Sequence, residues 1–257
     1  MGILNVTPDS FYAKSRVTTE QQILAQAEKM LREGATILDI GGMSTRPGAA
    51  EVSETEEVYR TIKNIANIAN NFPNTRISID TYRSKVAAEA VAAGAHIVND
   101  VSNGRHDALL LPTVAALGVP YILMHSIGNS VTMQQNPEYN DVTKSVFDFF
   151  VLKINELRTL GIQEIWLDPG FGFGKTVEHN YELLRNLSVF KTLGCPLLVG
   201  VSRKSMICKP LQISPEAALP ATSALHLYAL QQGAQVLRTH DVAEAIQTIE
   251  LYKYLND

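Results

Sequence analysis

The chain has 257 residues, of which 46% are hydrophobic and 19% are charged, and its net charge is −4 at pH 7. This composition is ordinary for a globular protein, and the slightly acidic balance gives no reason to expect a nucleic acid or an anionic membrane as a partner. No apolar stretch reaches the roughly 18 residues of a membrane span. The two cysteines, Cys195 and Cys208, are too few for a disulfide framework, so a reduced, cytoplasmic protein is expected.

Short apolar runs alternate with longer helical patterns along the whole chain. The expected strands, in chain order, are 3–5, 36–40, 76–80, 96–100, 121–125, 165–170, 196–204 and 235–240. The expected helices are 20–33, 53–71, 84–93, 109–117, 142–160, 179–193, 215–232 and 242–255. Ser53 followed by Glu56 is a capping-box signature, and a glycine follows most of the other helices. The pattern therefore predicts eight strand–helix units.

The predicted strands are continuous apolar runs, which is typical of parallel strands buried on both faces. Eight such units in about 250 residues match a (β/α)8 TIM barrel, which is an α/β fold. An open, doubly wound sheet also alternates strands and helices and stays open as the alternative. No linker or low-complexity tract divides the chain, so residues 1–257 are predicted to form a single domain.

Polar residues recur where the predicted strands end. The residues at these ends are Asn5, Asp39, Asp80, Asn99, Asp100, Met124, His125, Asp168, Ser202, Arg203, Lys204, Arg238 and His240. A single Asp after a strand is more often a helix cap or turn residue. So many coincident polar ends are better explained by a site, because the active site of a barrel lies at the carboxyl ends of its strands.

The chemistry of these residues indicates the kind of ligand. Asp80 and Asp168 are acceptors, whereas Lys204 and Arg238 are donors only. Such a set suits a flat heterocycle with donors on one edge and acceptors on another. Arg238 and His240 lie two residues apart on one strand, so they share a face and predict an anion site.

The stretch DPGFGFGKT looks like a nucleotide-binding loop but fails both tests for one. Pro169 occupies a position where a phosphate-binding loop needs glycine, and Lys175 occupies the third glycine position of a dinucleotide fingerprint. We interpret the glycines as a tight turn that brings Phe173 toward the site. Trp166 and both cysteines are expected to have packing or incidental roles.

Seven segments, one per barrel strand and in order, resemble the dihydropteroate synthase family: MGILNVTPDSF, DIGGMSTRPGA, SIDTY, IVNDVS, DPGFGFGKT, LLVGVSRKS and LRTHDV. The resemblance covers essentially the whole chain. It implies a transferase that condenses 6-hydroxymethyl-7,8-dihydropterin diphosphate with p-aminobenzoate, giving 7,8-dihydropteroate and pyrophosphate. It also implies magnesium as cofactor and a homodimer formed through the last helices.

The resemblance also implies the role of each site residue. Asp80, Asp168 and Lys204 are the catalytic residues, and with Asn99 they hold the pterin in a pocket that Met124 and Phe173 line. Arg238 lies against the pterin ring and binds the diphosphate with His240, while Asn5 binds diphosphate and magnesium. The p-aminobenzoate site is formed by Thr45, Arg46, Pro47 and Ser205.

In the implied mechanism, the C–O bond to diphosphate breaks first and the amine then traps the cation left on the pterin methylene. The loops 7–19 and 41–52 are long for a compact barrel, which favours ordered binding with p-aminobenzoate second. Two alternatives stay open. A corrinoid-type methyltransferase barrel would share the Asp and Asn ring around the pterin but has no use for STRPG or SRKS, and a non-catalytic paralogue would bind pterin only.

Overall fold

The computed structural model describes residues 1–6, 20–43, 52–127 and 138–256. Six parallel strands pair in chain order: β1 (Gly2–Asn5), β2 (Ile37–Gly41), β3 (Arg76–Asp80), β4 (Ile97–Asp100), β5 (Tyr121–Met124) and β6 (Ile165–Asp168). A further parallel pair comprises β7 (Leu198–Val199) and β8 (Val236–Leu237). Bridges between Leu167 and Leu197 and between Gly2 and Thr239 join the two sheets, so the eight strands close into a barrel. The TIM-barrel prediction is confirmed, and an open sheet is excluded.

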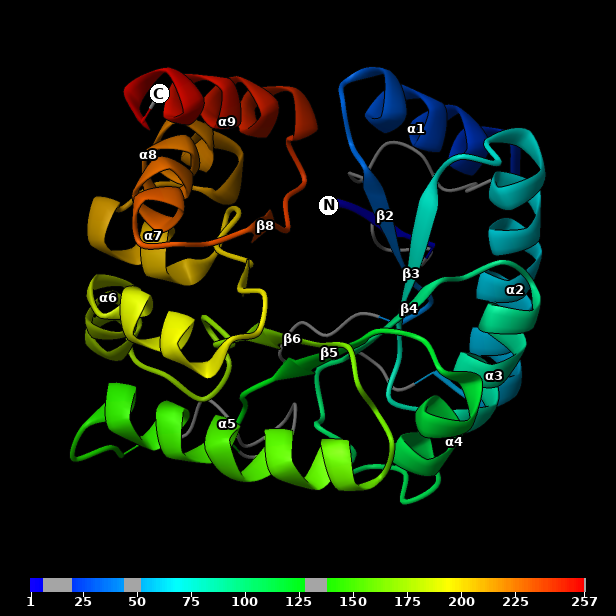
Figure 1. Ribbon diagram of the computed structural model, residues 1–257. Coiled ribbons are helices and arrows are strands. Elements are labelled where there is room, and N and C mark those ends of the chain that lie inside the picture. Colours follow the sequence, from blue (N-terminus) through cyan, green and yellow to red (C-terminus); the bar gives the residue numbers. More distant parts are fainter. Residues whose placement is uncertain (7–19, 44–51, 128–137, 257) are drawn as a thin grey trace.

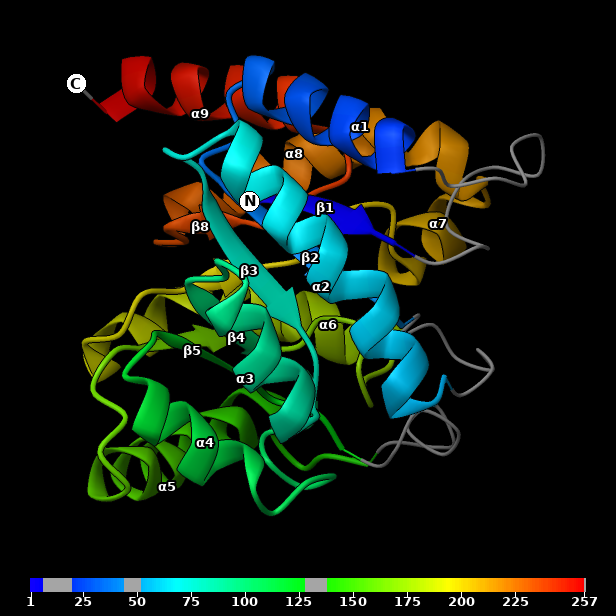
Figure 2. The ribbon, with the colours of Figure 1, turned by 90° about the vertical axis from the view of Figure 1, so that its right-hand side faces the viewer.

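The helices form a ring around the strands, as the view along the barrel shows (Figure 1). They are α1 (Glu20–Arg32), α2 (Glu54–Asn71), α3 (Ser84–Ala92), α4 (Leu110–Leu117), α5 (Val142–Thr159), α6 (Val177–Arg185), α7 (Ser205–Leu211), α8 (Leu219–Gln231) and α9 (Val242–Asn256). Helices α1 and α9, from opposite ends of the chain, lie side by side (Figure 2), where Ile246 packs against Gly34. No helix in these described ranges is both long and apolar enough to cross a membrane.

Local sequence signals set the ends of several helices. The side chain of Ser53 accepts a hydrogen bond from the backbone N–H of Glu56 at the start of α2, as the capping signature predicts. Helix α4 ends at Gly118 with φ of 64°, a left-handed conformation that glycine adopts without a side-chain clash.

The predictions for the region after α5 are wrong in several places. The predicted helix 179–193 is α6 followed by a 3-10 helix, η1 (Leu187–Leu193), whose three-residue period puts Leu187 and Phe190 into the core together. The predicted strand 196–204 is shorter, since β7 covers Leu198–Val199 and the chain already turns at Ser202 and Arg203, where Arg203 adopts φ of 54°. Helix α7 was not predicted, since Pro210 in its last turn argues against a helix.

Helix α8 likewise starts later than the predicted 215–232, because Pro215–Ala218 forms the 3-10 helix η2 before it. The eighth strand is also shorter than predicted, with two residues in the ladder. The seventh unit therefore contains two α-helices between its strand and the next.

The barrel interior has two layers. Its lower layer is a separate apolar cluster of Ile37, Ile97, Ile122, Trp166 and Leu198. Side chains on a strand alternate between faces, so the residues two positions further along also point into the barrel. These include Asp39, Asn99, Met124, Asp168 and, after Val236, Arg238. The apolar floor, to which Trp166 belongs as expected, therefore carries a polar layer on the carboxyl side.

Candidate active site

The upper layer contains an ion-pair cluster built from four different strands. Arg238 donates from Nε to Asp39 Oδ2 at 2.6 Å and from Nη2 to Asp80 Oδ2 at 2.8 Å. Asn99 donates from Nδ2 to the same Asp39 oxygen at 3.1 Å. One guanidinium thus connects two carboxylates on the inner wall of the barrel.

Burial and the neighbouring charges shift the pKa values of the ionisable groups in this cluster in opposite directions. Burial raises the pKa of Asp80 to about 7, while the guanidinium of Arg238 acts in the opposite direction. Burial alone would lower the pKa of Arg238, but the carboxylates of Asp39 and Asp80 raise it above its usual range. Arg238 is therefore a permanent cation, and the site can favour positive charge near Asp80.

Asp168 and Lys204 form the opposite wall. Asp168 is buried, and its Oδ1 accepts the backbone N–H of Gly170 at 2.8 Å. Lys204 donates from Nζ to the carbonyl oxygen of Phe171 at 2.6 Å. Burial raises the pKa of Asp168 and lowers that of Lys204 to about 8, and each group's charge opposes the shift of the other. Acceptors and donors therefore face the same space.

The glycines of DPGFGFGKT form the tight turn that the sequence predicts. Gly170, Gly172 and Gly174 all have positive φ. A Cβ on Gly170 would lie 1.9 Å from the carbonyl oxygen of His125, so only glycine fits there. The turn brings the ring of Phe173 next to Lys204, as expected from the sequence.

A buried lysine closes this turn. Lys175 donates from Nζ to the carbonyl oxygens of Gly170 and Phe173 at 3.0 and 3.1 Å, and lies 3.0 Å from Nδ1 of His125. Burial lowers the pKa of Lys175 to about 7. The pKa of His125 falls far below its usual value, through burial first and then through the charges of Lys175 and Arg105, so the imidazole is neutral. Lys175 thus ties the end of β5 to the turn after β6.

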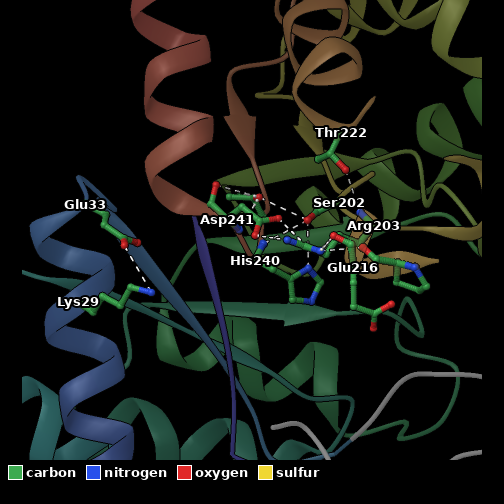
Figure 3. A network of polar contacts seen from close by, with 10 residues as sticks. Lys29, Glu33, Ser202, Arg203, Glu216, Thr222, His240 and Asp241 are labelled. Carbon is green, nitrogen blue, oxygen red and sulfur yellow. Dashed lines mark hydrogen bonds and ion pairs between the residues drawn. The ribbon is translucent and has the colours of Figure 1, made fainter. Parts of the chain in front are cut away.

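The ends of β7 and β8 are joined by the network in Figure 3. The hydroxyl of Ser202 lies 3.1 Å from Nδ1 of His240. Arg203 binds both carboxylate oxygens of Asp241, at 2.8 and 2.7 Å, and donates to the carbonyl oxygens of Pro215 and Glu216. Arg203 is thus a structural anchor that holds His240 and the neighbouring Lys204 at one rim.

The other predicted site residues are distributed as follows. Asn5 lies half-buried at the end of β1, and Gly41 on β2 leaves space beside its carboxamide, because a Cβ there would lie 3.3 Å from Asn5 Oδ1. Met124 is buried beside Asp168 in the strand register, and Ser205 is exposed at the start of α7. Thr45, Arg46 and Pro47, and residues 7–19 and 44–51 of the two loops behind the ordered-binding hypothesis, lie outside the described residues.

Sequence reasoning missed two contributions to this site. Asp39 stands among the strand-end residues, but no role was predicted for it, and its partner Arg238 is 199 positions away along the chain. For Lys175, the sequence predicted no role, and its identity only excluded a nucleotide-binding motif. Its place after three turn-forming glycines was the one signal that its side chain could fold back onto the turn.

One polar group noted at the strand ends, Asp100, is structural instead. Asp100 accepts from the backbone of Ser102 and Gly104, both at 2.6 Å, and from the hydroxyl of Tyr121 at 2.7 Å. Both cysteines are free, with Cys195 buried in the core. Asp100 therefore supports the barrel from outside the inner polar layer.

Comparison with known proteins agrees with this geometry. Residues 1–240 match the family model described as pterin binding enzyme. Dihydropteroate synthase of Escherichia coli strain K12 is 44% identical over 253 residues, covering 98% of this chain and 89% of that protein. The enzyme of Streptococcus pyogenes is 43% identical over 246 residues, covering 94% and 90%.

Solved structures extend the agreement to the fold. Yersinia pestis dihydropteroate synthase, in a sulfonamide drug complex, superposes with a TM-score of 0.95 at 41% identity, covering 99% of this chain and 93% of that chain. The Xanthomonas albilineans enzyme with 4-aminobenzoic acid gives a TM-score of 0.92 at 40% identity, covering 99% and 92%. The chain belongs to the dihydropteroate synthase family, a family of transferases within the pterin-binding enzymes.

Proposed function

We propose that this chain condenses 6-hydroxymethyl-7,8-dihydropterin diphosphate with p-aminobenzoate, giving 7,8-dihydropteroate and pyrophosphate, and that residues 1–257 act as one domain in doing so. The observation that carries the proposal is the inner polar layer, in which Asp80, Asp168 and Lys204 face one space above an apolar floor. This matches a flat ring that carries donors and acceptors on different edges.

In this proposal, the pterin lies in the mouth of the barrel. Asp168 and Asp80 accept from its ring N–H and amino groups, and Asn99 and Lys204 take part in holding the ring. Met124 and the ring of Phe173 supply the apolar walls. A buried carboxylate is a strong acceptor, so these contacts fix the orientation of the pterin.

The chemistry follows from the charges around the pterin methylene. Loss of diphosphate leaves positive charge there, which the carboxylates of Asp80 and Asp168 favour. Arg238 uses two of its donor atoms on Asp39 and Asp80, which leaves others for the departing diphosphate, and His240 stands at the same rim. The amine nitrogen of p-aminobenzoate then forms the new C–N bond and releases one proton, and we assign its site to Thr45, Arg46, Pro47 and Ser205.

Mg²⁺ is proposed as the cofactor, with Asn5 as its protein ligand. The described residues include no group of three or more His, Cys, Asp or Glu side chains able to hold a metal. Mg²⁺ commonly takes few protein ligands and several phosphate oxygens, and the space that Gly41 leaves beside the Asn5 carboxamide fits that pattern. When bound, the ion neutralises charge on the leaving diphosphate.

A cytoplasmic homodimer is also proposed. Leu251, Tyr254 and Leu255 are exposed on α9, with 60%, 82% and 64% of their surface accessible, which supports contact through the last helices. The two free cysteines are in keeping with a reduced compartment.

Pyrophosphate release from the pterin diphosphate, measured with and without p-aminobenzoate, tests the function. Release that depends on p-aminobenzoate, with formation of dihydropteroate, is expected. A non-catalytic pterin-binding paralogue would release none under either condition. Methyl transfer from a methylated pterin to a corrinoid, without pyrophosphate release, would instead favour the methyltransferase alternative.

A further inference from the structure

Asp39 is a carboxylate of the inner wall that binds two other residues of the candidate site. It is fully buried on the inner face of β2, and its Oδ2 accepts from both Arg238 and Asn99. Its Oδ1 has no hydrogen-bond partner among the described residues. One buried carboxylate therefore holds two side chains that the proposed function places around the pterin.

The position of Asp39 also sets the charge of the inner layer. Arg238 lies between Asp39 and Asp80, while Lys204 interacts electrostatically with Asp168. Without Asp39, the layer would hold Asp80 and Asp168 against Arg238 and Lys204, so its excess of negative charge, which favours a positively charged pterin, would be lost. With Asp39 present, the carboxylates in this layer outnumber the cations.

We infer that Asp39 is a positioning residue of the active site, which orients Arg238 and Asn99 and neutralises Arg238 so that Asp80 can stabilise positive charge on the pterin. This inference rests on the proposed function. It assigns to Asp39 no contact with the substrate, and its effect on the reaction passes through its two partners.

The test is the variant Asp39→Asn, with Ser78→Ala as its matched control. Ser78 is the register partner of Asp39 on β3, and its buried hydroxyl has no partner among the described residues, so this control removes a polar atom at the same depth without removing a charge. We expect Asp39→Asn to raise the KM for pterin diphosphate about 10-fold and to lower kcat, with the KM for p-aminobenzoate within about twofold of the parent. Ser78→Ala is expected to keep both constants.

This pattern distinguishes positioning from folding. A purely structural loss would reduce the active fraction, which lowers kcat and leaves both KM values unchanged. Either that result, or turnover of folded Asp39→Asn within about threefold of the parent, would overturn the inference.

A double-mutant cycle with Arg238→Gln provides the second measurement. If Asp39 acts mainly through Arg238, adding Asp39→Asn to Arg238→Gln should change kcat/KM less than about threefold. The double variant removes both members of the ion pair, so it remains informative where Asp39→Asn alone fails to fold. A further loss above about threefold would show that Asp39 does not act mainly through Arg238, which would contradict the neutralisation of Arg238 that the inference assigns to it.

Failure of the proposed function is recognised separately, because the parent would then form no dihydropteroate. In that case, calorimetric binding of the pterin diphosphate to parent, Asp39→Asn and Ser78→Ala decides the matter. Weaker binding by Asp39→Asn alone would support the positioning role, and equal binding by all three would overturn it.

Discussion

The ammonium nitrogen of Lys204 lies 4.8 Å from the centre of the Phe173 ring, so residues from two different strand–helix connections meet over the barrel mouth. A cation above an aromatic face is attracted to it. The same nitrogen donates to the carbonyl oxygen of Phe171, which fixes its direction. The position suits a compact ammonium group that meets a ring from one side.

Replacement of Lys204 by Arg is expected to remove most of the activity while the fold survives. The planar guanidinium is larger and directs its donors in a fixed fork, so it cannot reproduce the contact with Phe171 and leave the same space for substrate. Steady-state kinetics should show a loss in kcat/KM of at least about 10-fold. Lys209→Arg is the control, because Lys209 is an exposed lysine on α7, the helix that begins directly after Lys204. Near-parental turnover of Lys204→Arg would reject the role.

The Asp168→Asn variant is expected to weaken pterin binding by about 3–5 kcal/mol, because an amide presents a donor where a buried charged acceptor is needed. Isothermal titration with the pterin substrate measures this. Asp100→Asn is a matched control, since Asp100 is also a buried carboxylate at a strand end but binds protein donors. It should lower the melting temperature and leave pterin affinity intact. Asp168→Asn with affinity within about threefold of the parent would be incompatible with the proposal.

Gly170→Ala should be far more damaging than Gly118→Ala. Both glycines have positive φ, but a Cβ on Gly118 meets no atom within 4 Å. Gly118→Ala should therefore cost about 1–2 kcal/mol of unfolding free energy, the cost of the left-handed conformation alone. The clash of Gly170→Ala with a backbone carbonyl adds to this, for a total of about 3–5 kcal/mol. Denaturant unfolding of both variants measures the difference, and equal costs would contradict the close fit of the turn against β5.

Lys175 should give the protein a distinctive pH dependence. Its pKa is about 7 in the folded chain against 10.5 ordinarily, so between these values the unfolded state binds more protons than the folded state. The contribution of Lys175 to the unfolding free energy therefore rises with pH, by up to about 1.4 kcal/mol per pH unit. It is lowest below pH 7, where both states are protonated.

Lys175→Met should remove this rise. Urea unfolding between pH 7 and 9, compared with the parent, is the measurement. Lys29→Met is the control, since Lys29 is an exposed residue of α1 that pairs with Glu33 (Figure 3). An unchanged pH slope in Lys175→Met would mean that the lysine stays protonated in the folded protein throughout this range.

Short-range sequence signals predicted the helix ends, which are determined by interactions between residues close together in the chain. Ser53 marks the start of α2 and Gly118 the end of α4, because caps act within one helical turn. Helix α7 was missed because its helicity depends on the tertiary setting more than on its sequence, which includes Pro210.

The candidate site also has a part that the sequence predicts and a part that it does not. That polar groups meet at one rim was predictable, since parallel strands bring their carboxyl ends together. The pairing of Asp39 with Arg238 was not, because β2 and the end of β8 are far apart along the chain and these two side chains meet only through closure of the barrel. The fold of Lys175 back onto its own turn depends on carbonyl directions that no residue pattern reveals.

The two-layer interior limits how this sequence can change by insertion or deletion. Ile37 and Asp39, or Trp166 and Asp168, are spaced by the two-residue period of one strand, so one added or lost residue between them would reverse which side chains face inward. Such a change in β2 would turn Asp39 toward the helices and put an apolar neighbour beside Arg238. Length variation within the strands is therefore excluded by the same packing that keeps the barrel closed, and the connections between strands and helices are where changes in length can accumulate.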